Sequence, residues 1–351
     1  MMNAAARINQ TRERTQNAST KNATLEAQFV RTKRYDRILE EILVVHEQRK
    51  AAAKAGTLRK ARGLALLAPT GSGKTRTLDE LFLEIETLNG KSGRPSDRLI
   101  LSVKVKTPAN LKSVGISILR ELGCVGLETP KLRGSDSASE IWEVIHWQLH
   151  QQGIEILHLD EAQDLLECAN VLQRRAVLST LKTLTQNDQW PVCLVLSGTE
   201  NLQVLLNEDP QLARRLNVMG IPALAYATDH KILTKILTQF VEESGLKTDG
   251  LDADAFLPRL IAASANRFGI FLELVIGAIF DADLAGSSKV ELRHFAAAFE
   301  RRTDCNFSEN PFIAEDWHKI DVWKLLAKGI EKPEPARKPR RKKSDPPPDD
   351  P

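Results

Sequence analysis

The chain of 351 residues has few of the residues that cross-link small proteins or bind structural zinc. Its cysteines lie far apart and form no Cys-x-x-Cys pair; they are Cys124, Cys168, Cys193 and Cys305. This spacing argues against a zinc site and a disulfide framework, so we expect buried, reduced thiols. The chain also lacks an apolar run of the roughly 20 residues that span a membrane, and its start lacks the apolar core of a signal peptide. We therefore expect a soluble, cytoplasmic protein with no membrane partner.

A large charge of one sign is also missing from the composition. Lys and Arg number 49 against 46 Asp and Glu, which leaves a formal net charge of +3. This balance excludes a histone-like basic mass, so any nucleic-acid site has to be a local basic patch. With 42% apolar residues, a chain of this length can bury one large core or two smaller ones.

The two ends of the sequence lack the apolar periodicity of packed elements. Residues 1–30 are polar and rich in Asn, Thr, Gln and Arg, and we expect them to form a disordered basic arm. Residues 331–351 contain seven prolines and a basic cluster, and we expect a disordered tail there.

The middle of the chain alternates apolar strands with amphipathic helices, which predicts an α/β fold. A helix around residues 35–45 and a basic linker, 49–62, come first. Strand patterns follow at 63–68, 99–105, 154–159 and 192–196. The helical patterns between them open near 73 and cover 111–122, 138–151 and 171–185. This order predicts a parallel sheet flanked by helices on both faces, within a core of residues 31–226.

After about residue 226 the strand patterns stop and helical patterns continue. They cover 230–244, 252–264, 268–284 and 289–300. We therefore expect a helical lid over residues 227–304. The segment 305–330 would then be available for docking partners.

A phosphate-binding loop lies between the first predicted strand and the helix after it. It reads Ala68-Pro69-Thr70-Gly71-Ser72-Gly73-Lys74-Thr75, followed by Arg76. The glycines allow backbone N–H groups at the helix start to wrap phosphates. Lys74 can reach the β and γ oxygens of a nucleotide, and the Thr75 hydroxyl suits Mg²⁺. Ala68 stands where the usual pattern has glycine, a position that mainly needs a small side chain. The loop predicts binding of ATP with Mg²⁺.

A pair of acids ends the strand that begins at residue 154. Strand alternation sends the carboxylates of Asp160 and Glu161 in different directions. Asp160 can therefore hold the Mg²⁺ shell while Glu161 meets a water in line with the γ-phosphate. Gln163 and Asp164 could support the acids, although Asp164 is equally suited to cap a helix.

Five further polar residues are candidates for the nucleotide site. Ser197 or Thr199, after the strand at 192–196, could sense the γ-phosphate or cap the next turn. Arg214 and Arg215 have no obvious place in this chain's own site and suit a finger that completes a neighbour's site. A surface salt bridge is the alternative for them. Arg267 puts a cation at a helix start, where the macrodipole disfavours it unless an anion such as phosphate compensates.

These elements in this order resemble the AAA+ ATPases, and their combination is similar to the TniB/TnsC family of transposition regulators. The segments that carry the likeness are Phe29-Val-Arg-Thr-Lys-Arg-Tyr35, Asp160-Glu-Ala-Gln-Asp-Leu-Leu166, Leu196-Ser-Gly-Thr-Glu200, Asp209-Pro-Gln-Leu-Ala-Arg-Arg-Leu216, Ser264-Ala-Asn-Arg267-Phe-Gly269 and Asn310-Pro-Phe312. In that family an aromatic residue follows the finger arginine, where this chain has Leu216. The resemblance makes Arg215 the first choice for the finger and Arg214 the second, and Arg267 resembles the second sensor.

The resemblance implies an AAA+ P-loop core with a C-terminal helical lid. It further implies a homo-oligomer, either a ring or a helical filament, that assembles on double-stranded DNA of any sequence when ATP is bound. Such a protein works with a target-selection protein and recruits or activates a DDE transposase.

Several basic residues could face the DNA backbone, although for each lysine alone a solvated surface role is the simpler interpretation. They are Lys104, Lys106 and Lys112, with Arg31, Lys33 and Arg34 near the arm. The alternatives for the whole protein are a clamp- or helicase-loader-type ATPase and a STAND-like ATPase that binds only protein.

Overall fold

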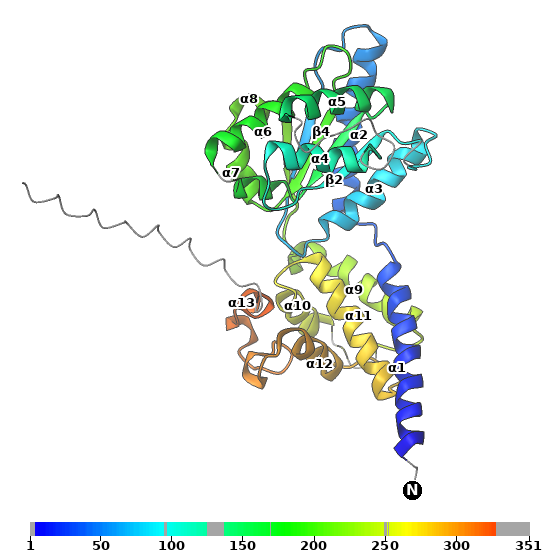
Figure 1. Ribbon diagram of the computed structural model, residues 1–351. Helices are drawn as coiled ribbons and strands as arrows, with labels where there is room; N and C mark the ends of the chain where they lie inside the picture. Colours follow the sequence, from blue (N-terminus) through cyan, green and yellow to red (C-terminus); the bar gives the residue numbers. More distant parts are fainter. Residues whose placement is uncertain are drawn as a thin grey trace, which may run out of the picture.

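The computed structural model describes residues 4–94, 97–124, 137–168, 170–248, 251 and 253–327. These residues form an upper α/β lobe and a lower helical lobe (Figure 1). The predicted tail at 331–351 lies outside the described residues.

The upper lobe is built on a parallel five-stranded sheet in the order β2-β3-β4-β1-β5. The strands are β1 (Gly63–Leu67), β2 (Ile100–Lys104), β3 (Ile156–Asp160), β4 (Cys193–Gly198) and β5 (Leu216–Gly220). The predicted parallel sheet is confirmed, but β5 was not predicted. Its five residues include the exposed Val218 and end in Gly220, so they lack the continuous apolar run that marks the central strands.

Helices cover both faces of the sheet. They are α2 (Lys33–Lys54), α3 (Lys74–Leu88), α4 (Leu111–Glu121), α5 (Ala138–Gln151), α6 (Val171–Leu184), α7 (Asn201–Asn207) and α8 (Pro210–Ala213), with a 3-10 turn at Ala162–Glu167. Alternation along β1 sends Leu64 and Leu66 into the core beneath α2 and α3, and Ala65 into the core beneath α4 to α7. Both faces are therefore buried, as the apolar strands predict.

The lower lobe, called the lid here, contains only helices in the part that the structure describes. They are α9 (Tyr226–Glu243), α10 (Ala253–Ala263), α11 (Phe268–Ala285), α12 (Leu292–Thr303) and α13 (Val322–Leu326), with 3-10 turns at Phe307–Glu309 and Trp317–Lys319. α11 contributes nine buried residues and forms the centre of the lid core. Among the described helices, none combines the length and apolarity needed to cross a membrane.

The N-terminal arm corrects a prediction. We expected residues 1–30 to be disordered, but α1 (Ala4–Ala27) is a helix that lies along α11 (Figure 1). Lys21 forms an ion pair with Asp283 at 2.9 Å, and Leu25 is buried in the lid core. The local sequence lacks apolar periodicity, so these tertiary contacts supply the stabilisation that offsets the ordering entropy.

Residues 305–327, which we call the strap, pack on the lid after α12. Phe312 is buried against Phe256, Phe295 and Phe299. The buried Asn310 donates from Nδ2 to the carbonyl of Ala296 at 2.9 Å. The described part of the segment for which we predicted partner docking is thus held against this chain's own lid.

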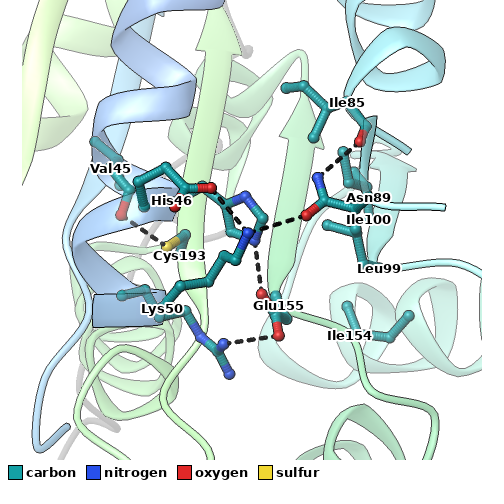
Figure 2. Close-up of polar contacts among 12 residues, drawn as sticks. Val45, His46, Lys50, Ile85, Asn89, Leu99, Ile100, Ile154, Glu155 and Cys193 are labelled. Atoms are coloured by element: carbon teal, nitrogen blue, oxygen red, sulfur yellow. Dashed lines mark hydrogen bonds and ion pairs between the residues drawn. The ribbon is translucent and has the colours of Figure 1, made fainter. Parts of the chain in front are cut away.

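A buried ion network fastens α2 to the sheet. Helix α2 also runs on past the end that the sequence predicted for it. We expected a linker from Arg49, but Arg49 lies within α2 and is buried. Its Nη1 lies 3.1 Å from the Glu155 carboxylate, and His46 Nε2 lies 2.6 Å from the other oxygen. Figure 2 shows Glu155 facing His46, with Cys193 beside Val45. Burial alone would raise the pKa of Glu155, but the hydrogen bond from His46 and the charge of Arg49 lower it.

This network predicts a stability defect at Glu155. Glu155→Ala should lower the free energy of unfolding by about 3 kcal/mol, because Arg49 stays buried without its counter-charge. Because the folded pKa of Glu155 is lowered, its contribution is complete above the unfolded pKa of about 4.3 and is lost as pH falls through the folded pKa. Urea unfolding should therefore show the defect at neutral pH and a smaller one in acid. Glu47→Ala, which removes an exposed ion pair with Lys50, is the matched control and should cost under about 0.5 kcal/mol.

Candidate functional site

The predicted phosphate loop lies at the carboxyl end of β1 and leads directly into α3. Gly71 and Gly73 have φ values of 81° and 86°, in the left-handed region that favours glycine. Gly73 is also the N-cap of α3 and contributes no side-chain cap. The first N–H groups of α3 are therefore left for an anion, and the helix dipole favours a negative charge there.

Lys74 and Thr75 sit at the start of α3, where a bound phosphate would lie. Lys74 is 5% exposed, and its Nζ donates to the Ala68 carbonyl at 3.1 Å. Burial lowers the pKa of Lys74, while the charges of Glu161 and Asp160 oppose that shift. Thr75 Oγ1 donates to Asp160 Oδ2 at 2.9 Å. The loop and the predicted acid pair thus meet in one site.

A chain of hydrogen bonds runs beneath Asp160 across three strands. Ser102 Oγ lies 2.8 Å from His158 Nδ1, and His158 Nε2 lies 2.8 Å from Ser197 Oγ, which donates to Asp160 Oδ1. Burial lowers the pKa of His158 to about 4, so the ring is neutral at physiological pH. Because the ionised Asp160 can only accept, Nε2 carries the ring proton and Nδ1 accepts from Ser102. The Ser197 proton is committed to Asp160, so Ser197 orients the acid.

Glu161 is aimed by its backbone and by a neighbouring amide. Its φ of 53° lies in the left-handed region, which a non-glycine residue seldom adopts outside constrained sites. Gln163 donates to Glu161 Oε2 at 2.7 Å and accepts from the Thr199 N–H at 3.1 Å. A Cβ on Gly198 would lie 2.3 Å from the Gln163 oxygen. Gln163, which the sequence suggested as a possible support for the acids, thus links Glu161 to the end of β4.

Two buried hydroxyls in this site have no hydrogen-bond partner among the described residues, and they test the fit of Mg²⁺ and phosphate. They are Ser72 Oγ in the loop and Thr199 Oγ1 after β4. Orphaned hydroxyls of this kind are costly unless a ligand or water satisfies them. Thr75 and Asp160 add the hydroxyl and carboxylate oxygens that Mg²⁺ prefers. This donor set fits a nucleoside triphosphate with Mg²⁺, with Thr199 as the hydroxyl left to meet the γ-phosphate.

The start of α11 in the lid touches the loop directly. The Arg267 Nη1 donates to the Thr70 carbonyl at 2.7 Å, and the Ile270 N–H lies 3.3 Å from the Gly71 carbonyl. A Cβ on Gly269 would lie 2.6 Å from that same Gly71 oxygen. The lid can approach this closely because residue 269 has no side chain.

A cavity of about 260 Å³ lies beside the loop, between the N-terminal segment and the lid. Its walls include Phe29, Val30, Ile221, Phe268, Leu272 and Ile276, with Ser72, Gly73 and Arg76 at the loop end. Arg76 also donates to the Ala27 carbonyl. The apolar walls suit a nucleotide base. Sequence reasoning missed this pocket, because its walls come from segments some 200 residues apart that no local pattern connects.

The two arginines lie at the other edge of the sheet. Gly63, the first residue of β1, pairs with Leu216 and donates its N–H to the Arg215 carbonyl, whereas the loop follows the last residue of β1. Pro69 comes six positions after Gly63, and in extended chain this is a span of about 20 Å. Arg215 is bound within the chain, with Nε donating to the Gln211 carbonyl at 3.1 Å. The Arg214 side chain is exposed and has no hydrogen bond or ion pair to any described residue, although its backbone N–H donates to the Pro210 carbonyl at 3.2 Å.

The candidate DNA contacts are spread over several environments. Lys104 and Lys106 are exposed, and Lys112 is half-buried. Lys104 ends β2 and lies opposite Asp160 of β3 in the sheet register, so it lies beside the acid pair. Near the arm, Lys33 is exposed, but Arg34 donates to Asp229 at 2.8 Å and Arg31 is paired with Asp36 and Glu84. Arg31 and Arg34 are therefore committed to contacts within the chain.

Comparisons with known proteins agree with this geometry. The family model TniB, described as "Bacterial TniB protein", matches residues 22–226, which is more than half of the chain. No match is found among curated proteins.

Among solved structures, the chain is similar to Cdc6p from Pyrobaculum aerophilum, with a TM-score of 0.55, 15% identity, and coverage of 79% of this chain and 70% of that one. It is also similar to the Aeropyrum pernix ORC1 protein in complex with DNA, with a TM-score of 0.54, 22% identity, and coverage of 78% and 67%. A third is the Aeropyrum pernix ORC2 protein with ADPNP and ADP, with a TM-score of 0.52, 16% identity, and coverage of 75% and 67%. These likenesses show the AAA+ P-loop fold.

The close approach of the lid predicts that residue 269 must be glycine. Gly269→Ala should weaken binding of ATP about tenfold, because the new Cβ forces the start of α11 away from the Gly71 carbonyl. Gly220→Ala is the matched control, since a Cβ there meets nothing within 4 Å and its φ is ordinary. Equilibrium binding of a fluorescent ATP analogue measures both. Unchanged binding by Gly269→Ala, with its fold intact, would contradict the closed lid.

Proposed function

Because the chain belongs to the bacterial TniB family, we propose that it is an ATPase that assembles on double-stranded DNA in the ATP state and regulates transposition. The observation that carries the ATPase part is the meeting of the phosphate loop with Asp160 and Glu161, through the 2.9 Å hydrogen bond between Thr75 and Asp160. The family match and the AAA+ fold support the wider role.

In the proposed reaction, each residue of the site has one task. The α3 N-terminus and Lys74 bind the β and γ phosphates, and the apolar cavity takes the base. Thr75 and Asp160 hold Mg²⁺, which would neutralise developing phosphate charge. Glu161, held by Gln163, accepts the proton of the attacking water, and Thr199 and Arg267 contact the γ-phosphate.

If Arg214 or Arg215 is the finger, it serves a neighbouring copy, because both lie at the opposite edge of the sheet from the loop. That edge is basic: Lys60 and Arg62 line one hollow with both arginines. The loop edge carries the carboxylates of Asp160, Glu161, Asp164 and Glu200 beside the phosphate loop. Arginines at one edge and a nucleotide site at the other suit copies stacked head to tail, which gives a ring or an open helical filament.

Exposure refines the choice between the two arginines. The resemblance favours Arg215, but its guanidinium is bound to Gln211 and Thr185, so it would have to leave these contacts to reach a neighbour. The Arg214 side chain is exposed and has no hydrogen bond or ion pair to any described residue, so it could reach a neighbour without that loss. We therefore place Arg214 on equal terms with Arg215.

The DNA and protein partners rest on the family and on one structural neighbour. The Aeropyrum pernix ORC1 structure was solved with DNA, and Lys104 and Lys106 are exposed at the loop edge of this chain. Membership of the TniB family supports recruitment of a DDE transposase and cooperation with a target-selection protein. A clamp or helicase loader and a STAND-like ATPase without DNA are the competing functions.

Mixing of variants tests hydrolysis and the finger together. Glu161→Gln should bind ATP but hydrolyse it at least about 100-fold more slowly, because the general base is lost. The finger variant, Arg214→Ala or Arg215→Ala, should also bind ATP and be inactive. Co-assembled with Glu161→Gln, it should regain activity, since some interfaces join an intact finger to an intact base. The arginine whose variant shows this recovery is the finger; no recovery despite proven co-assembly would rule out a finger in trans.

Salt titration of DNA binding, carried out with ATP and with ADP, tests whether ATP switches on binding to DNA. Each neutralised phosphate should contribute about 0.9 to the slope of log affinity against log salt. Lys104→Ala with Lys106→Ala should weaken binding equally on all sequences and reduce that slope. The matched control replaces Lys231 and Lys235, two exposed lysines of α9. Tight binding should require ATP rather than ADP. Equal binding with ATP and ADP would contradict this ATP dependence. Strand separation would favour the clamp or helicase loader, and no binding to DNA would favour the protein-only ATPase.

A further inference from the structure

The strap reaches back from the lid to the phosphate loop through one aromatic residue. Trp323 lies on α13, and the guanidinium carbon of Arg267 lies 3.3 Å from the centroid of its ring. Arg267 in turn donates to the Thr70 carbonyl at 2.7 Å. A side chain of the strap therefore contacts the arginine that touches the loop.

Both ends of this contact are held firmly. Val322 and Leu325 flank Trp323 on α13 and are buried in the lid core. Ala265 and Asn266, just before Arg267, both have left-handed φ values of 50° and 59°. Two successive non-glycine residues in that region are costly and persist only where surrounding structure imposes them. The backbone of Arg267 is thus fixed, and its long side chain is the part that needs holding.

An aromatic ring is an apt partner for an arginine that has to meet a phosphate. The ring covers the flat face of the guanidinium and leaves the N–H groups at its edge free to donate. A carboxylate would occupy those N–H groups and neutralise the charge. Only one of the donor nitrogens of Arg267, Nη1, has a partner among the described residues, the Thr70 carbonyl. The remaining donors are available to an anion at the loop.

We propose that Trp323 is a positioning residue that holds Arg267 against the phosphate loop and so sets the preference of the site for ATP over ADP. The proposal rests on the proposed function, because the γ-phosphate is the group that Arg267 would contact. The strap then serves the nucleotide site of its own chain. Displacement of the strap by a partner would loosen Arg267 and lower that preference.

The test compares dissociation constants for a non-hydrolysable ATP analogue and for ADP by calorimetry. Trp323→Ala should reduce the ATP-to-ADP preference about fivefold, within the range of a partly exposed cation–π contact, and leave ADP affinity unchanged. Trp323→Phe should restore most of the preference. In an Arg267→Ala background, Trp323→Ala should have no further effect. A merely structural role for Trp323 would weaken both nucleotides alike.

Trp317→Ala is the matched control, because Trp317 lies on the same strap and stacks on a different arginine, Arg259, at 5.6 Å. It should leave the ratio unchanged. The proposal would be overturned if Trp323→Ala left the ATP-to-ADP preference unchanged or raised the affinity for ATP. It would also be overturned if Trp317→Ala changed that preference equally. A separate readout without nucleotide is the NMR signal of the Arg267 Nε–H, which the ring should shift in the wild type and not in Trp323→Ala. Failure of the wild type to bind either nucleotide would instead overturn the proposed function.

Discussion

Parallel pairing of β4 with β3 and of β1 with β4 and β5 determines where the loop, the acid pair, Thr199 and the two arginines lie. Because the strands run the same way, the residues after β1, β3 and β4 gather at one edge of the sheet. The loop, the acid pair and Thr199 meet there. The same pairing puts Arg214 and Arg215, which precede β5, at the far edge. One topological constraint thus assembles the candidate site and places Arg214 and Arg215 at the edge away from it.

The site depends equally on small residues where the two lobes touch. Gly71 and Gly269 let the start of α11 approach the loop to hydrogen-bonding distance. Near the same contact, Ala265 and Asn266 have left-handed backbone conformations that are unfavourable for non-glycine residues. Packing of the lid core offsets this cost. Two further contacts fix side chains that the backbone alone would leave free. The hydrogen bond from Ser197 orients Asp160, and the ring of Trp323 holds the Arg267 guanidinium.

Local patterns in the sequence were sufficient to locate the loop, the acid pair and the sheet they follow. These features depend on a few residues at fixed spacing, so they can be recognised without knowing what packs on them. β5 and α1 could not be found in this way, since Val218 is exposed and α1 is stabilised by distant partners such as Asp283. The base cavity and the role of Ser197 are likewise products of tertiary contact. The two hydroxyls differ in role because Ser197 lies in the hydrogen-bond chain through His158 and donates to Asp160, whereas Thr199 lies outside that chain.

If one of these arginines completes a neighbour's site, as we propose, their placement on the edge opposite the loop makes the two ends of a row of copies unequal. In an open head-to-tail row, one terminal copy has a nucleotide that no neighbour's arginine reaches, and the other has an arginine with nothing to complete. A row of n copies therefore contains n − 1 complete sites, whereas a closed ring contains n. In a growing filament the newest site at one end would keep its ATP until the next copy arrives, so the intact nucleotide would mark the end of the filament.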